Sequence, residues 1–186
     1  MQQQNLTENT YIIFTSDHGE LLGDHGLLHK GPPPYRQLTE VAMLLQGPGV
    51  SENQTSSALT NHIDLAPTIL DLSEIDFDTA WFDGMSMSPL IAGEGDSIRQ
   101  WNFGEYHPSA KPELYNQTIS TDRWRLTLYP ENPEWGEMFD LESDPHERRN
   151  VFHEAEMSTI KQELSQILNR EFPPQPEVEN EWICKW

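Results

Sequence analysis

The feature that most constrains the fold is a short apolar segment, residues 11–14, that runs directly into Thr-Ser-Asp-His-Gly (residues 15–19). Four consecutive apolar or aromatic residues ended by a turn predict a short buried strand. Polar side chains that follow such a strand lie at its carboxyl end, where the loops of open α/β sheets form ligand crevices. The sequence therefore predicts an α/β fold with a site at the tip of this strand.

A buried strand of this kind needs neighbouring strands on both sides and helices over its faces. Residues 1–10, which precede it, are polar and predict only the end of a helix and a turn. We therefore expect the chain to begin in the middle of a fold, whose earlier elements would cover the strand.

Three side chains after this strand form a candidate site. Asp17 and His18 offer a carboxylate and an imidazole to one divalent cation, and Lys30 offers a positive charge to an anionic substrate. Simpler interpretations remain open: Asp17 and Glu20 fit a capping box at a helix start, and Lys30 fits a solvated surface group. An Asp-His pair by itself is a weak metal signal.

Composition limits the function classes. The chain has 31 acidic and 11 basic residues and a net charge of −20, which argues against nucleic acid or an anionic membrane as a partner. The start lacks the basic and apolar regions of a secretory signal, and no apolar run is long enough to cross a bilayer. These features predict a soluble chain and leave its compartment undecided. The single cysteine, Cys184, excludes an intramolecular disulfide.

The remaining elements follow from periodicity and turn residues. Residues 31–35 contain three successive prolines and predict a rigid surface loop near the site, followed by a second short strand that ends at a Gly-Pro-Gly turn, residues 47–49. Residues 61–72 predict a helix whose regular part begins near Asp64. Four short strands are expected at residues 100–106, 114–120, 123–129 and 135–141, arranged as an antiparallel meander with a tight turn at 121–122.

The C-terminal part of the sequence predicts a helix and a tail. Apolar residues recur at helical spacing from residue 154 and stop before Pro173, so this helix should pack on the small sheet. A composition shift near Asp96 divides the chain into residues 1–95, a subdomain of residues 96–172 and a tail of residues 173–186. In the tail, Trp182 and Trp186 are expected to anchor the chain to the surface.

The stretch from residue 14 to Lys30 closely resembles the second metal-binding motif of the sulfatase family, in the alkaline-phosphatase-like superfamily. Other segments resemble family motifs in the same order, and together they cover residues 8 to about 170: the His-x-Asp-x-x-Pro-Thr run at residues 62–68, the segment from Phe82 to Gly95, and the run Met-Phe-Asp-Leu-Glu-Ser-Asp-Pro-His-Glu-Arg-Arg-Asn at residues 138–150. His62 and Asp64 are more simply interpreted as cap and hydrogen-bond partners than as catalytic groups.

The resemblance implies the fold: the C-terminal part of an α/β alkaline-phosphatase-like (sulfatase) fold, with a small four-stranded antiparallel sheet and a C-terminal helix. It also implies that Asp17 and His18 bind the cation, and that Lys30 contacts the sulfate and the leaving-group oxygen. Calcium is the metal that the resemblance implies, while a histidine ligand would also suit manganese or zinc.

The family nucleophile is a formylglycine made from Cys/Ser-x-Pro/Ala-x-Arg, and this sequence has no such motif. We therefore expect the nucleophile to come from a missing N-terminal half, and the chain alone to be an inactive fragment of a sulfate ester hydrolase. Two alternatives remain open: a phosphonate or phosphodiester hydrolase of the same superfamily, and a non-catalytic remnant.

Overall fold

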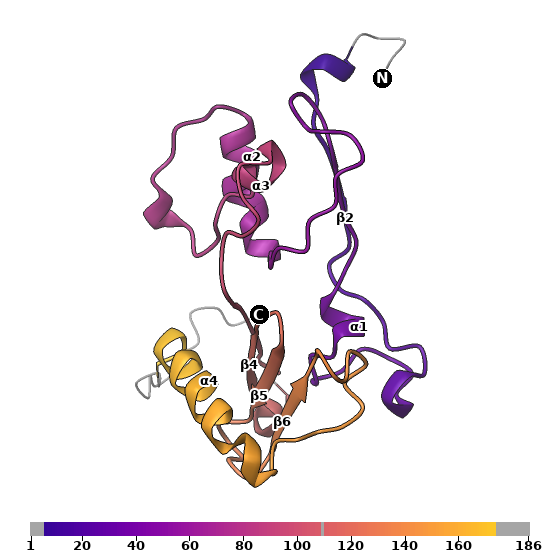
Figure 1. The fold of residues 1–186 in the computed structure, drawn as a ribbon, viewed down its shortest axis with the longest axis vertical. Helices are drawn as coiled ribbons and strands as arrows, with labels where there is room; N and C mark the ends of the chain where they lie inside the picture. The colour runs from indigo at the N-terminus through magenta and orange to yellow at the C-terminus, as the bar shows by residue number, and fades with distance from the viewer. Residues whose placement is uncertain (1–5, 109, 174–186) are drawn as a thin grey trace, which may run out of the picture.

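The computed structural model describes residues 6–108 and 110–173, which form an upper and a lower part (Figure 1). The upper part contains a two-stranded sheet and a pair of short helices, and the lower part contains a four-stranded sheet and the longest helix. The elements are β1 (Ile12–Thr15), α1 (Arg36–Thr39), β2 (Met43–Gln46), α2 (Leu65–Leu72), α3 (Ser88–Ala92), β3 (Asn102–Tyr106), β4 (Asn116–Ser120), β5 (Trp124–Leu128), β6 (Gly136–Asp140) and α4 (Ser158–Glu171). Short 3-10 helices lie between them, among them residues 24–26 and 62–64.

The four-stranded sheet is an antiparallel meander in the order β3-β4-β5-β6, which confirms the predicted topology. Each strand lies within its predicted range and is two residues shorter. The turn between β4 and β5 is tight, because the Thr121 N–H donates to the Trp124 carbonyl at 2.8 Å. Three residues, 121–123, join these two strands, which is a common length for a hairpin loop.

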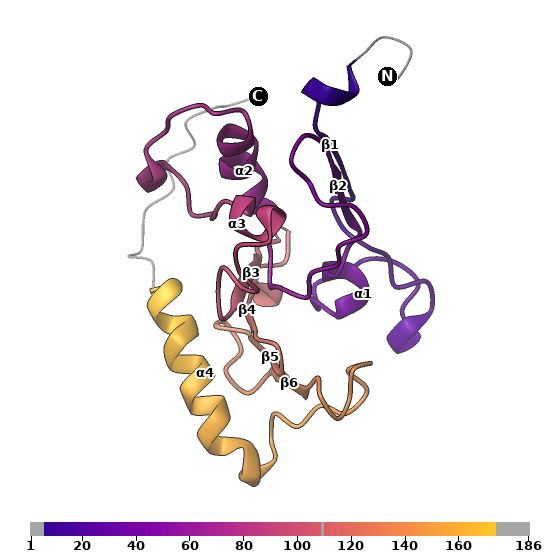
Figure 2. The ribbon, with the colours of Figure 1, turned by 45° about the horizontal axis from the view of Figure 1, so that its top comes forward.

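The main core lies between this sheet and α4, which runs along one of its faces (Figure 2). Ile119, Leu126 and Met138 occupy directly paired positions on three neighbouring strands and are fully buried. Leu164 and Leu168 of α4 lie one helical turn apart and pack on them. The predicted C-terminal helix, its apolar face and its packing on the small sheet are confirmed, and the helix ends before Pro173.

The predicted buried strand forms, but its burial and surroundings are different from the prediction. β1 spans Ile12–Thr15 and pairs antiparallel with β2, and Phe14 lies directly opposite Leu44. On the face that these two share, Phe14 is 58% exposed and Leu44 is 64% exposed. The apolar run forms a strand, as predicted. Its burial is not achieved, because no other strand or helix of the described residues covers this face.

The helix at residues 61–72 follows the prediction closely. A 3-10 turn at residues 62–64 leads into α2, so Pro67 falls in the first turn, where its missing N–H costs nothing. Asp64 is fully buried and forms a capping box with Asn61. The Asp64 carboxylate also accepts the Met85 N–H at 2.8 Å and pairs with Arg99. Asp64 is therefore a structural anchor, as its simpler interpretation predicted.

Two predictions receive no test from this structure. The division near Asp96 stays a prediction, and the tail residues Trp182 and Trp186, with Cys184, lie outside the described residues. Among the residues that the structure describes, no helix combines the length and the apolar character needed to cross a membrane.

The core predicts a clear contrast between two leucines. Leu168→Ala removes a fully buried side chain from between α4 and the sheet, and we expect it to lower the free energy of unfolding by about 2–5 kcal/mol. Leu22→Ala makes the same change at a residue that is 82% exposed and should alter stability by less than about 0.5 kcal/mol. Urea denaturation measures both, and similar losses would contradict the assignment of the core.

Candidate active site

The loop after β1 is fixed against α1 by a close approach of two backbones. The Gly19 N–H donates to the Leu38 carbonyl at 2.9 Å. A Cβ atom on Gly19 would stand 1.9 Å from the Gln37 carbonyl oxygen, which is far inside contact distance. The glycine of Asp-His-Gly is thus required by the backbone packing, and it holds Asp17 and His18 in place beside α1.

Asp17 lies two residues after the end of β1 and is largely exposed. Its Oδ1 atom accepts the His18 N–H at 3.0 Å, and this bond is the largest of the effects that lower the pKa of Asp17 below its usual value of 3.8. No helix starts here, and Glu20 bonds the N–H of its neighbour Leu21, so the capping-box interpretation is wrong. Asp17 Oδ2 remains free to bind a ligand.

The ring of His18 is oriented by a backbone carbonyl. His18 Nδ1 lies 2.6 Å from the Gly19 oxygen, which can only accept, so Nδ1 carries the proton in the neutral ring. The lone pair is then on Nε2, which lies 3.6 Å from Asp17 Oδ2. Fixing the second ring nitrogen in this way is how metal-binding histidines are usually held.

Lys30 reaches the same atom from the other side. Its Nζ lies 2.7 Å from His18 Nε2, so the ammonium donates to the lone pair. Asp17, His18 and Lys30, which are separated by up to 13 residues in the sequence, therefore converge on one point. All three line a cleft of about 1220 Å³ that extends to the four-stranded sheet.

The donor set fits part of a metal site. Asp17 Oδ2 and His18 Nε2 are close enough to contact one ion, because ligand bonds to divalent cations are about 2.0–2.6 Å long. The Lys30 ammonium, which occupies the Nε2 lone pair in this structure, would have to move aside when an ion binds there. Within the part of the chain that the structure describes, no cluster of three or more His, Cys, Asp or Glu side chains is suited to a metal. A hard cation generally takes six or more ligands, so these two residues fit as one side of a larger site.

His62 lies in the same cleft, and sequence reasoning did not place it there. Its Nε2 is 3.5 Å from the Thr15 hydroxyl at the end of β1. Asp64, two residues further on, is buried and structural, whereas the His62 side chain is exposed. The motif His-x-Asp was the available signal, but it does not reveal which of its two polar residues faces the cleft.

The Pro32–Pro34 segment forms a loop beside the site, as predicted, but it is packed against the protein and not fully exposed. The segment is half-buried against the four-stranded sheet. Asn116 Nδ2 donates to the Pro32 carbonyl at 3.0 Å, and Arg125 Nη1 donates to the Pro34 carbonyl at 3.2 Å. Prolines have no N–H to satisfy, so the segment can be buried with only its carbonyls paired.

Tyr35 ends this segment and points onto β6. Its hydroxyl donates to Glu137 Oε1 at 2.6 Å, and its ring stacks on His25 with centroids 3.7 Å apart. Burial raises the pKa of the Glu137 carboxyl, and burial together with this hydrogen bond raises the pKa of Tyr35. Burial and the nearby Glu137 raise the pKa of Tyr129 to about 12. Tyr35 and Glu137 thus form a polar contact, removed from most solvent, between the proline segment and β6.

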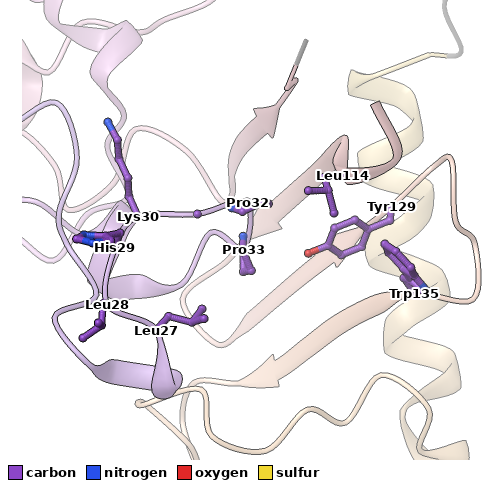
Figure 3. A pocket seen from close by; sticks show the side chains of 10 residues that line it. Leu27, Leu28, His29, Lys30, Pro32, Pro33, Leu114, Tyr129 and Trp135 are labelled. Carbon is purple, nitrogen blue, oxygen red and sulfur yellow. The ribbon is translucent and has the colours of Figure 1, made fainter. Parts of the chain in front are cut away.

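A second hollow of about 490 Å³ lies on the other side of the segment that follows Lys30 (Figure 3). Its walls are mainly apolar and include Leu27, Tyr129 and Trp135. Figure 3 shows the Lys30 ammonium pointing away from these aromatic rings. The reactive groups therefore face the larger cleft, and the apolar hollow is not part of the candidate site.

Comparison with known proteins identifies the family of the chain. Residues 23–172 match the family model described as "N-sulphoglucosamine sulphohydrolase, C-terminal". The chain belongs to the sulfatase family. Curated relatives include N-acetylglucosamine-6-O-sulfatase of Bacteroides thetaiotaomicron (31% identical, 87% of this chain), N-acetylglucosamine-6-sulfatase of Bos taurus (32%, 77%) and arylsulfatase K of Gallus gallus (32%, 81%). This sulfatase chain spans 30%, 31% and 29% of their respective lengths.

Solved structures show the same fold. A protein in complex with its substrate, D-glucosamine-2-N,6-O-disulfate, matches 91% of the sulfatase chain with a TM-score of 0.82 at 27% identity, over 35% of its own length. A phosphonate monoester hydrolase from Silicibacter pomeroyi also matches 91% of the chain, with a TM-score of 0.79 at 25% identity, over 36% of its own length. The predicted fold, the C-terminal part of an alkaline-phosphatase-like sulfatase fold, is thus confirmed.

The buried carboxyl of Glu137 predicts a pH effect on stability. Because its pKa is raised above 4.5 in the folded state, its stabilising effect is present at low pH and is lost as pH rises through the raised value. Glu137→Gln keeps an acceptor for Tyr35 but cannot ionise. We therefore expect this variant to gain stability relative to wild type as pH increases from about 4 to about 7.

Urea denaturation across this pH range measures the effect. Glu105→Gln is the matched control, because Glu105 also accepts a tyrosine hydroxyl, from Tyr115 at 3.1 Å, but is exposed. A constant difference between Glu137→Gln and wild type at every pH would contradict the raised pKa.

Proposed function

We propose that this chain is the C-terminal part of a sulfate ester hydrolase, in which Asp17 and His18 bind a divalent cation and Lys30 binds the sulfate. The observation that carries the proposal is the convergence at His18 Nε2: Asp17 Oδ2 lies 3.6 Å from this atom and Lys30 Nζ lies 2.7 Å from it, in a chain of the sulfatase family. A carboxylate and an oriented imidazole suit a cation, and an ammonium beside them suits an anionic tetrahedral group that contacts that cation.

Each residue has a separate task in this proposal. Asp17 and His18 supply an oxygen and a nitrogen to the cation, for which calcium is the first choice and manganese the second. A bound cation would neutralise charge on the sulfate oxygens. The Lys30 ammonium would stabilise charge that develops on the transferring group or the leaving oxygen. The net charge of −20 repels an anion at long range, so attraction depends on these local groups.

The remainder of the active site would come from an N-terminal part of the sulfatase fold, including the formylglycine nucleophile and further metal ligands. The length comparison supports this, because the chain spans about a third of its relatives. The exposed face of β1 and β2 supports it independently. Ile12, Phe14 and Leu44 share this face and are 43–64% exposed, although a strand with apolar residues on both faces is typical of a sheet covered on both sides.

A phosphonate or phosphodiester hydrolase is the second candidate. The observation in its favour is the match to the phosphonate monoester hydrolase from Silicibacter pomeroyi, whose TM-score is similar to that of the sulfated-sugar complex. Lys30 and the proposed cation would bind a phosphonate by the same electrostatic chemistry. The relative rates of hydrolysis of a sulfate ester and a phosphonate ester therefore distinguish the two functions.

Hydrolysis of an aryl sulfate and an aryl phosphonate by the full-length protein that carries this chain tests the proposal. We expect turnover of the sulfate, lowered by at least about a hundredfold in Lys30→Ala because a charge that stabilises the transition state is lost. Lys111→Ala is the control, because Lys111 is an exposed lysine outside both cavities. Faster turnover of the phosphonate would favour the second candidate, and equal loss in both variants would contradict the role of Lys30.

The isolated chain should have no sulfatase turnover, because its sequence contains no nucleophile motif. Hydrolysis of an aryl sulfate by the purified chain, above the rate of its Lys30→Ala variant, would show this expectation to be wrong.

Metal binding gives a test that does not depend on turnover. Calorimetric titration of the full-length protein with calcium and manganese should show binding tighter than about 10 μM. This binding should be lost when both Asp17 and His18 are changed to alanine. Asp24 and His25 provide a matched double-alanine control. They form the same dipeptide seven residues later in the sequence and do not line the cleft. Binding that survives in the Asp17, His18 variant would exclude these two residues as ligands.

A further inference from the structure

The four-stranded sheet has a second, polar face that is also buried. Residues whose side chains alternate with those of the core point away from α4: Asn116, Thr118 and Ser120 on β4, Arg125 and Thr127 on β5, and Glu137 on β6. Asn116, Arg125 and Thr127 are each at most 5% exposed. A polar sheet face normally contacts water, so the burial of this one indicates that it holds another part of the chain.

The segment that this face holds is residues 31–35, which directly follow Lys30. The three strands contact it in order: Asn116 on β4 bonds the Pro32 carbonyl, Arg125 on β5 bonds the Pro34 carbonyl, and Glu137 on β6 accepts the Tyr35 hydroxyl. Each successive strand thus fixes a position one or two residues further along. The segment is tied to the sheet across its whole length.

Glu147 closes this arrangement from the turn after β6. It is 1% exposed and has a left-handed backbone conformation, with φ of 53°. One of its carboxylate oxygens pairs with Arg125 Nη1, and the other accepts the Arg36 N–H at 2.7 Å. The guanidinium of Arg125 therefore contacts both the Pro34 carbonyl of the segment and Glu147, which in turn accepts the N–H of Arg36, the residue after the segment.

We propose that Asn116 and Arg125 are positioning residues that place the Lys30 ammonium for sulfate binding. This inference rests on the proposed function of Lys30. Only Gly31 separates Lys30 from Pro32, whose ring fixes its φ and disfavours the helical region at the residue before it, so the bond to the Pro32 carbonyl limits the positions that the Lys30 backbone can take. The ammonium stands at the His18 ring because the sheet fixes the backbone that carries it. Neither Asn116 nor Arg125 needs to contact the substrate.

Asn116→Ala is the direct test, made in the full-length protein that carries this chain. It removes the bond to the Pro32 carbonyl and leaves every ionised group in place. We expect two effects: faster hydrogen exchange of the backbone amides of Gly31 and residues 35–38, and affinity for inorganic sulfate about tenfold lower, since small misplacements of a binding group carry large costs. Hydrogen-exchange mass spectrometry and calorimetric titration with sulfate measure these effects.

Two controls separate positioning from general damage to the sheet. Asn132→Ala removes the same type of bond, from Asn132 Nδ2 to the Glu113 carbonyl at 2.9 Å, at an exposed site. Thr127→Val removes a buried hydroxyl from the same sheet face, where Thr127 bonds Thr118 and makes no hydrogen bond to the segment. Both controls should leave amide exchange in the segment and sulfate affinity unchanged.

Arg125→Lys provides a second variant in case Asn116→Ala does not fold. It keeps a positive charge for Glu147 but loses the longer, planar guanidinium, whose Nη1 bonds both Glu147 and the Pro34 carbonyl while its Nε bonds Ser120. We expect the same two effects in the same direction.

The outcomes decide the inference separately from the proposed function. Unchanged amide exchange in both variants would overturn the anchoring of the segment. Faster exchange with unchanged sulfate affinity would overturn the positioning role. If Lys30→Ala in the otherwise unaltered protein leaves sulfate affinity unchanged, the proposed function of Lys30 fails and the positioning role fails with it. Faster exchange together with weaker sulfate binding, absent from both controls, supports the inference.

Discussion

The buried pair of Arg125 and Glu147 is the interaction on which the arrangement of this chain depends. Both side chains are removed from water, and loss of either partner would leave an uncompensated buried charge, which costs about 3–5 kcal/mol. Such a pair contributes little net stability compared with apolar packing, but it strongly disfavours any arrangement in which the two groups separate. It joins β5 to the turn after β6, and both to the segment that follows Lys30.

The four-stranded sheet consequently has two different interfaces. One face is apolar and packs on α4, which gives the lower part of the molecule its main core. The other face is polar and binds the backbone of the proline segment through directional hydrogen bonds. Apolar packing tolerates small shifts, whereas hydrogen bonds weaken steeply with distance and angle. The polar face is therefore the better device for holding a reactive group at a defined place.

The candidate site combines groups from two such restraints. Asp17 and His18 are placed by the end of β1 and by the contact of Gly19 with α1. Lys30 is placed from the opposite direction, by the sheet that lies after residue 100 in the sequence. The two restraints meet at α1, whose first residue, Arg36, donates its N–H to Glu147 and whose third residue, Leu38, accepts the Gly19 N–H. This short helix connects both sides of the site.

Sequence alone was sufficient for the elements whose signal is local. Spacing and turn residues predicted β3 to β6, α2 and α4. The motif around Asp17, His18 and Lys30 predicted the family, and the structure brings these three side chains together. Tertiary structure decided what depends on partners distant in the chain. The exposure of Phe14 depends on what covers β1, the burial of the proline segment depends on β4 to β6, and the roles of Asn116, Arg125 and Glu147 arise only when residues about 80 to 110 positions apart meet. Local spacing reports a residue's preferred backbone geometry, but burial and hydrogen-bond partners are properties of the folded chain, and only the fold specifies them.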